Sequence, residues 1–428
     1  MNSEPTKRDG KLQTDIAWNV GSLAILGLAG IGLNTIVICF YDAAVLGTFN
    51  QVFALYFVFS QFAVGGIHLS VLKHAAEHPD DPVRVREIVC SSLVPTTVLA
   101  GMFTAVFVLA RKPLAEMLQS PEVAMGVLVA APGLFLFSLN KVLMAVLNAE
   151  RRMKHFAFFQ AFRPISFIAS AVVLAGTGQA GALLPFMFTV AEGLVLVGLV
   201  IALFPRLRGF VGVVSKRWVI EHMRFGGKAY LSGVLAGLNT RLDVLMLGWF
   251  MSDKVVGIYS FAAIIAEGFF QLTVIVRNNF NPILVRLLAD TKQADLITFV
   301  KRGRNKTWWW MGAIGAASVA LYPLAAKLVI LFGAQSDLAG SWSVFAIIAA
   351  GVVLSAGYLP FMNLLVVAGR PASHTVLIFA GVVFNVAANC FLIPVWGANG
   401  AAVALGAAYV FSVLLLRVMT RRLLGVRI

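Results

Sequence analysis

Charged residues are scarce in this sequence. Only 12% of the 428 residues are Asp, Glu, Lys or Arg, whereas 60% are hydrophobic. A soluble domain is about half apolar and about a quarter charged. The chain is also far longer than one hydrophobic core requires. These proportions exclude an ordinary soluble domain and favour a protein with several membrane spans.

Cysteine and acidic residues are few as well. The three cysteines, Cys39, Cys90 and Cys390, lie far apart beside or within apolar runs, so we predict neither a metal pair nor a disulfide framework. Lys and Arg number 34, against 19 Asp and Glu. Because the basic residues form short clusters without interleaved aromatic residues, we expect no nucleic-acid partner. The sequence has no G-x-x-x-x-G-K-[ST] loop, so we expect neither ATP hydrolysis nor a cofactor.

Apolar runs make up most of the chain. A membrane-spanning helix needs about 20 predominantly apolar residues. The runs are too long and too continuous for the alternating strands of a barrel. We therefore predict an all-α integral membrane protein with twelve transmembrane helices. The predicted spans are 15–40, 45–72, 87–110, 122–148, 156–177, 182–205, 227–251, 255–286, 305–332, 341–367, 373–395 and 399–418.

The positions of Lys and Arg support this count. If the chain begins in the cytoplasm, twenty-six of the 34 basic residues fall in the termini and the even-numbered connections. Four fall on the opposite side and four within spans. Basic residues concentrate on the cytoplasmic side of membrane proteins, so we predict a multi-pass protein of the cytoplasmic (inner) membrane with both termini cytoplasmic. No small-residue cleavage site follows the polar start, and we expect no removable signal peptide.

An internal repeat divides the chain into two halves. Matched pairs recur in order at a nearly constant offset, and each half holds six predicted spans. An even number per half makes the repeats parallel, as in transporters built from two lobes. We predict one lobe at 1–215 and a second at 216–428, with chance similarity of glycine-rich helix ends as the alternative. The matched pairs are Gly47 and Gly257, Gln61 and Gln271, His155 and His374, and Gly178 and Gly397.

The segment from Phe391 to Ala404 carries the pattern L-I-P-x-x-G-x-x-G-A-A-x-A. With Asp243…Leu247-Gly248, Val256-Gly257-Ile258-Tyr259 and Ala44-Val45-Leu46-Gly47, it resembles Wzx-type oligosaccharide flippases. These belong to the multidrug/oligosaccharidyl-lipid/polysaccharide exporter superfamily. The resemblance covers nearly the whole chain. It implies two six-helix bundles that export a lipid-linked oligosaccharide, held on undecaprenyl diphosphate, for surface polysaccharides such as the O-antigen of lipopolysaccharide. The implied partners are that substrate and the membrane lipids.

Polar and charged side chains within the predicted spans are the candidate functional residues. A charge at the bilayer centre costs roughly 2.5–3.5 kcal/mol on insertion scales, so such residues are usually paired or functional. A guanidinium group offers a planar fork that suits phosphate oxygens. We therefore predict alternating access through a cationic central cavity, where the anionic headgroup is bound by Arg277, Arg241, Asn278, Arg163 and Lys141.

The acidic residues in the spans have a different predicted function. Glu267 and Asp243 are candidates for binding a coupling ion, either a proton or sodium. Glu192 of the sixth span is left without an assignment. Structural alternatives stay open: the two cations of spans four and five can snorkel to the headgroups, Arg241 and Glu267 can form a buried pair, and Asp243 can serve helix packing.

Two other functions share parts of this pattern. A multidrug antiporter has the same architecture, but its cavity is expected to favour acidic residues. A sugar polymerase or ligase needs a sizeable outer loop, whereas the predicted outer loops are short, so we predict no catalytic residues and no enzyme. The string His74-Ala75-Ala76-Glu77-His78 matches the H-x-x-E-H pattern of one class of zinc proteases. Prolines directly after it end the helix and no third ligand is evident, so we predict no metal site.

Overall fold

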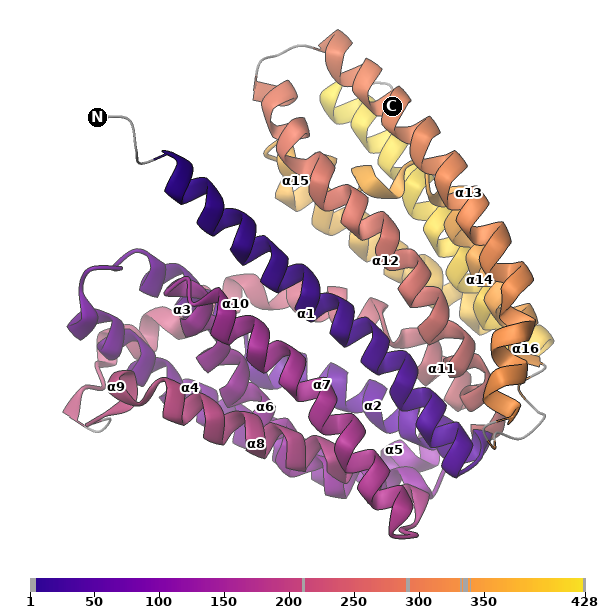
Figure 1. The fold of residues 1–428 in the computed structure, drawn as a ribbon, viewed down its shortest axis with the longest axis horizontal. Coiled ribbons are helices and arrows are strands. Elements are labelled where there is room, and N and C mark those ends of the chain that lie inside the picture. Colours follow the sequence, from indigo (N-terminus) through magenta and orange to yellow (C-terminus); the bar gives the residue numbers. More distant parts are fainter. Residues whose placement is uncertain are drawn as a thin grey trace. The chain divides into compact units, whose positions relative to one another are not determined.

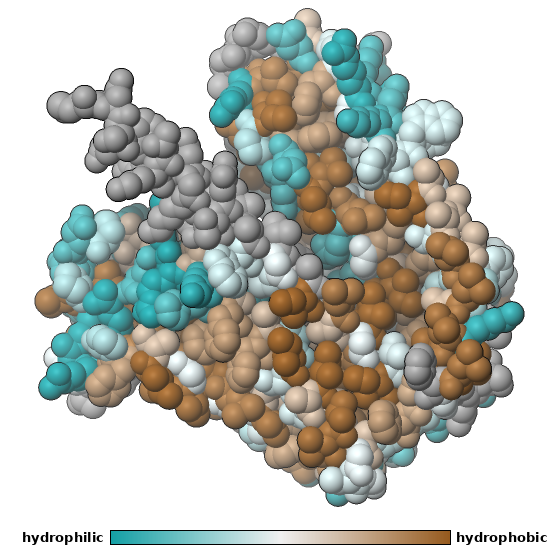
Figure 2. Space-filling model, in the orientation of Figure 1, coloured by the Kyte–Doolittle hydropathy of each residue, from teal (hydrophilic) through white to brown (hydrophobic). Residues whose placement is uncertain are grey.

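The computed structural model describes residues 5–209, 212–289, 293–331, 333, 338 and 340–425. Within these ranges every regular element is a helix, and most helices are long (Figure 1). The predicted all-α class is therefore confirmed. On the face drawn in Figure 2, apolar residues cover broad areas of the surface. Soluble monomers rarely expose apolar patches larger than a few hundred Å², so this surface is that of helices facing lipid.

The chain forms two compact units. Unit 1 comprises Met1–Val37 and Thr48–Leu238, and unit 2 comprises Ile38–Gly47 and Asn239–Ile428. The predicted lobes at 1–215 and 216–428 stay a prediction. In the structure residues 216–238 pack with unit 1, and the short segment 38–47 packs with unit 2.

Unit 1 is organised around α6. This helix packs against α3, α4, α5, α7 and α8. Prolines inside several of these helices (Pro95, Pro132 and Pro164) do not end them, because neighbouring helices satisfy the freed backbone groups in a membrane protein. The helices are α1 Pro5–Phe40, α2 Ala43–Val64, α3 Ile67–Ala76, α4 Pro82–Leu109, α5 Arg111–Met117, α6 Glu122–Ala149, α7 Met153–Gly176, η1 Gly181–Leu183, α8 Phe186–Ala202, α9 Phe204–Leu207 and α10 Lys216–Asn239.

Unit 2 is organised around α16, which packs against α11, α14 and α15 and also contacts α12. The backbone of α16 is interrupted at Gly397, whose φ of 53° and ψ of −129° break the helical course. Glycine adopts a positive φ at little steric cost. The helices are α11 Leu242–Phe250, α12 Asp253–Ala289, α13 Gln293–Leu331, α14 Ser341–Ser355, η4 Leu359–Phe361, α15 Leu364–Val367 and α16 Pro371–Leu424.

Each predicted span falls on one helix or on consecutive helices in the described residues. By length and composition alone, eight of the described helices can cross a membrane, or nine if the bent pair Ser341–Ser355 and Leu359–Val367 forms one span. Twelve spans were predicted, and three features explain why this test finds at most nine among the described helices. The helix α16 carries two of them, the apolar part of α1 (Ile25–Phe40) is short, and the seventh span is interrupted between α10 and α11.

Glycines allow two close helix crossings, one in each unit. In unit 2, a Cβ on Gly47 would overlap the carbonyl oxygen of Asp253, and a Cβ on Gly257 would overlap that of Ala43. Gly47 and Gly257 are the pair that the internal repeat matches. In unit 1, a Cβ on Gly226 of α10 would lie 2.6 Å from the carbonyl oxygen of Gly65. This second crossing attaches α10 to unit 1.

Candidate functional site

A buried ion pair lies between α7 and α8 in unit 1. The Glu192 carboxylate is fully buried, and its Oε1 lies 2.8 Å from Nε of Arg163. The Asn140 amide of α6 donates hydrogen bonds of 2.8 Å to Oε2 of Glu192 and of 2.8 Å to its backbone oxygen. Buried charges are retained only when they are paired and hydrogen-bonded. Arg163, a predicted ligand for the substrate, is therefore held by Glu192.

Lys141 lies beside this pair. Its Nζ lies 5.5 Å from the ring centroid of Phe137, and Cζ of Arg163 lies 5.2 Å from the same centroid. Both contacts are within the range of cation–π attraction. His68 of α3 is close enough to interact electrostatically with Lys141. Among the ion pairs of the described residues, none contains Lys141.

The corresponding pair in unit 2 is looser. Nη2 of Arg241, the residue before α11, lies 3.8 Å from Oε2 of Glu267 on α12. The Glu267 side chain is 41% exposed. Asp243 differs, because it is buried and its carboxylate accepts a hydrogen bond from the hydroxyl group of Tyr259. Of the two candidates for a coupling ion, Glu267 is thus the exposed one and Asp243 the buried one.

Arg277 lies further along α12 and is half-buried. Its Nε is buried without a hydrogen-bond partner, and among the described residues no acid pairs with its guanidinium group. His374, in the first turn of α16, interacts electrostatically with it. The neighbouring Asn278 is exposed. The helix continues past Asn281-Pro282 rather than ending there.

The structure therefore places the five predicted ligands in two groups. Arg163 and Lys141 lie together in unit 1. Arg241, Arg277 and Asn278 belong to unit 2, where α12 carries the last two. That all five line one central cavity stays a prediction.

Several polar residues near these groups were not singled out from the sequence. Asn140 fixes Glu192, and Tyr259 fixes Asp243. In unit 2, Asn385 and Asn389 of α16 are fully buried, and the Asn389 amide donates bonds of 2.9 Å to the backbone and side-chain oxygens of Asn385. In the sequence, the pattern that could have identified Asn385 and Asn389 is two amide side chains four residues apart in an otherwise apolar run.

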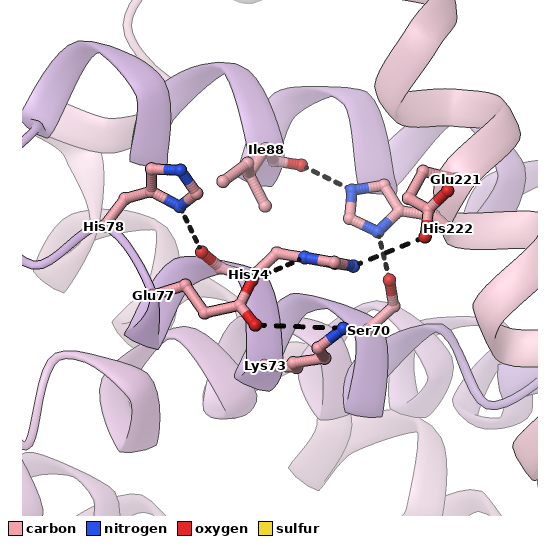
Figure 3. Close-up of polar contacts among 8 residues, drawn as sticks. All are labelled: Ser70, Lys73, His74, Glu77, His78, Ile88, Glu221 and His222. Atoms are coloured by element: carbon pink, nitrogen blue, oxygen red, sulfur yellow. Dashed lines mark hydrogen bonds and ion pairs between the residues drawn. The ribbon is translucent and has the colours of Figure 1, made fainter.

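The histidines of the H-x-x-E-H pattern contact a carboxylate and a backbone oxygen of the same segment (Figure 3). Nδ1 of His74 faces Oε2 of Glu77 at 3.0 Å, whereas Nδ1 of His78 bonds to the backbone oxygen of His74 at 2.9 Å. The helix α3 ends at Ala76, one residue before Glu77. Within the described ranges, no group of three or more His, Cys, Asp or Glu is arranged to hold a metal ion.

Sequence comparison identifies one family. The family described as "Polysaccharide biosynthesis protein" matches residues 15–267, more than half of the chain. No curated protein matches the sequence.

Solved structures of transporters have the same fold. A structure titled "Lipid II flippase MurJ, inward closed conformation" superposes with a TM-score of 0.79 at 11% identity, covering 95% of this chain and 87% of that one. An inward-facing multidrug resistance MATE family transporter of the MOP superfamily gives 0.76 at 12% identity, with 93% and 94% covered. A MOP superfamily transporter from Pyrococcus furiosus gives 0.60 at 13% identity, with 97% and 95% covered. At these identities the likeness shows the fold alone.

Proposed function

The chain belongs to the polysaccharide biosynthesis protein family, and from this premise we propose that it is a flippase for a polyprenyl-diphosphate-linked oligosaccharide. In this proposal it moves the substrate from the inner to the outer leaflet of the cytoplasmic membrane, for surface polysaccharide synthesis. Two features support a transporter rather than an enzyme. The helices form a transporter fold, and the predicted outer loops are too short for a catalytic site.

The observation that carries the proposal is the unpaired guanidinium group of Arg277. A cation within an apolar helix is costly unless a partner or a water-filled cavity compensates it. No acid pairs with Arg277 among the described residues, and its Nε lacks an acceptor. A diphosphate would supply both the negative charge and the acceptor oxygens, and bidentate Arg–phosphate contacts are strong.

Lys141 is the second proposed phosphate ligand, because its ammonium group likewise lacks an acid among the described residues. Arg163 and Arg241 act differently, since each already faces a carboxylate at 2.8 Å or 3.8 Å. We propose that Arg163 supports the site, and that Arg241 exchanges Glu267 for the substrate. The exposed Asn278 then contributes an amide beside Arg277.

The proposed mechanism is alternating access, with the headgroup in a cationic cavity and the polyprenyl tail in lipid. With both termini cytoplasmic and the inside negative, outward movement of an anionic headgroup is favoured by about 2.3 kcal/mol per charge per 100 mV. Coupling to a proton or to sodium can add to this. Glu267 is the better candidate for a coupling site, because its partly exposed carboxylate can exchange an ion with water, whereas Asp243 already accepts the Tyr259 hydroxyl.

The test is complementation of surface polysaccharide in cells that lack the flippase. Arg277→Ala should lower export by about 10-fold or more, since a charged hydrogen bond contributes about 1.5–3 kcal/mol. Arg277→Lys should retain part of the activity, because it keeps the charge and loses the fork. Arg286→Ala, at the exposed end of the same helix, is the matched control and should retain full export.

Membrane levels of each variant are measured alongside, so that a folding defect is not counted as a transport defect. Full export by both Arg277→Ala and Lys141→Ala would contradict the anionic substrate. That result would favour the second candidate function, a multidrug antiporter, which the fold of the MATE transporters also suits. Drug-resistance assays on the same variants would then distinguish the two.

A further inference from the structure

The helix α10 connects the two units. It packs with unit 1, ends at Asn239, and is followed by α11 of unit 2, which begins at Leu242. Its first turns precede the apolar run that starts at residue 227, and they contact α3 and α4 through polar side chains (Figure 3). Together with the Gly226 crossing and the packing of the His74 ring against Trp218 and Phe225, these contacts attach the start of α10 to unit 1.

One of these contacts is neutral. Nε2 of the buried His222 donates a hydrogen bond of 3.0 Å to the Ile88 oxygen of α4, because a carbonyl can only accept. The other nitrogen, Nδ1, lies 2.9 Å from the Ser70 hydroxyl of α3 and accepts a hydrogen bond from it. Burial lowers the pKa of His222 to about 4. His222 therefore holds α10 in the same way at any pH near neutrality.

The second contact involves His74, one turn after Ser70 on α3. Its Nδ1 lies 3.0 Å from Oε2 of Glu77, and its Nε2 lies 3.7 Å from Oε1 of Glu221 on α10. A neutral imidazole has one N–H, so one of its nitrogens would present a lone pair to a carboxylate. The imidazolium form presents an N–H to both carboxylates. The geometry around His74 therefore suits the charged form.

We propose that His74 is a proton-controlled clamp: when protonated it ties Glu221, and with it the start of α10, to the end of α3. When neutral it keeps Glu77 and releases Glu221. Histidine is the side chain whose charge ordinarily changes between about pH 5 and 8. The clamp acts within unit 1 and does not depend on what the protein transports.

The charges around His74 come from the two helices it joins. Lys73 and His78 lie on or just after α3, and Nζ of Lys73 lies 3.8 Å from Oε1 of Glu77. On α10 the titratable neighbours are Glu221 and the neutral His222, while α4 contributes the Ile88 carbonyl. Lys73 and His74 therefore both face the Glu77 carboxylate. The carboxylate of Glu221, in contrast, faces His74 across the boundary between the two helices.

The test measures hydrogen exchange of the amides of residues 216–226 in the full chain in detergent. Measurements at about pH 5.5 and about pH 8 bracket the titration of a histidine, after correction for the intrinsic pH dependence of exchange. A partly exposed ion pair is worth about 0.2–1 kcal/mol, so wild-type protection should be about 1.4- to fivefold greater at the lower pH. His74→Gln and Glu221→Gln should each abolish this difference.

His78→Gln is the matched control, because His78 lies just after α3 and bonds to the backbone oxygen of His74 rather than to a carboxylate. It should keep the wild-type pH difference. A difference that survives in both His74→Gln and Glu221→Gln, or that is lost in His78→Gln, would overturn the clamp. Equal wild-type protection at both pH values would do the same. If His74→Gln fails to fold, Glu221→Gln carries the test alone, since its partly exposed carboxylate is not needed for packing.

Discussion

The two units hold similar ion pairs in different surroundings. In unit 1, Arg163 and Glu192 meet at 2.8 Å, Glu192 is fully buried, and Asn140 donates a hydrogen bond to its Oε2. In unit 2, Arg241 and Glu267 are 3.8 Å apart and Glu267 is 41% exposed. The first pair is fixed by its neighbours, whereas the second is longer and has a partly exposed carboxylate.

We propose that the two pairs have different roles. Breaking a buried pair leaves a charge without compensation, which makes the pair necessary for folding even when it adds little net stability. A loose, partly exposed pair costs little to open. An alternating-access transporter needs charges that can change partners, so the pair of unit 2 suits transport and that of unit 1 suits structure.

The largest predicted effect comes from neutralising each acid in turn. Glu192→Gln should destabilise the protein by about 3–5 kcal/mol, because the buried Nε and Nη2 atoms of Arg163 would stay without a charged partner. Glu267→Gln should cost less than about 1 kcal/mol. Thermal unfolding of the purified variants in detergent measures both.

A double variant provides the control for this prediction. Replacing both partners, with Arg163→Met and Glu192→Leu, removes the unpaired charge and should recover most of the stability lost in Glu192→Gln. Equal destabilisation by Glu192→Gln and Glu267→Gln would remove the distinction between the units.

A smaller effect is predicted at the glycine crossings, where the units should behave alike. Gly257→Ala in unit 2 and Gly226→Ala in unit 1 both place a methyl group against backbone oxygen. Overpacking costs about 1–3 kcal/mol, and backbone cannot move aside as a side chain can. Thermal unfolding should show losses of that order in both variants. Gly101→Ala is the control, since no atom lies within 4 Å of its added Cβ; a loss there as large as at Gly257 would contradict the explanation.

Much of the fold was predictable from the sequence, because long apolar runs and the distribution of Lys and Arg depend on local composition. The positions at which helices are interrupted were less predictable. Composition indicated one seventh span, whereas the chain interrupts it between Asn239 and Leu242. The attachment of α10 to unit 1 depends on contacts such as Gly226 with Gly65, which no periodicity reveals.

The candidate site was predictable only as a set of residue types. A charge within an apolar run identifies Arg163 and Arg277 equally. Their difference arises because α8 places Glu192 against Arg163, whereas no described acid pairs with Arg277. Which helices become neighbours is a tertiary property, and so the division into supporting and available cations needed the structure.

The smallest predicted effect concerns an ion pair that separates distance from burial. In unit 1, Nε of Arg206 lies 2.6 Å from Oε1 of Glu150, closer than Arg163 lies to Glu192. Their side chains are 28% and 17% exposed, so water screens the attraction and can solvate either group alone. Glu150→Gln should therefore cost only about 0.2–1 kcal/mol, and the cost should shrink as salt is raised to about 1 M, where screening acts within about 3 Å. Thermal unfolding at low and high salt, with Glu192→Gln as the reference, checks this. A loss at Glu150 as large and as salt-independent as that at Glu192 would mean that distance, and not burial, distinguishes the ion pairs of this protein.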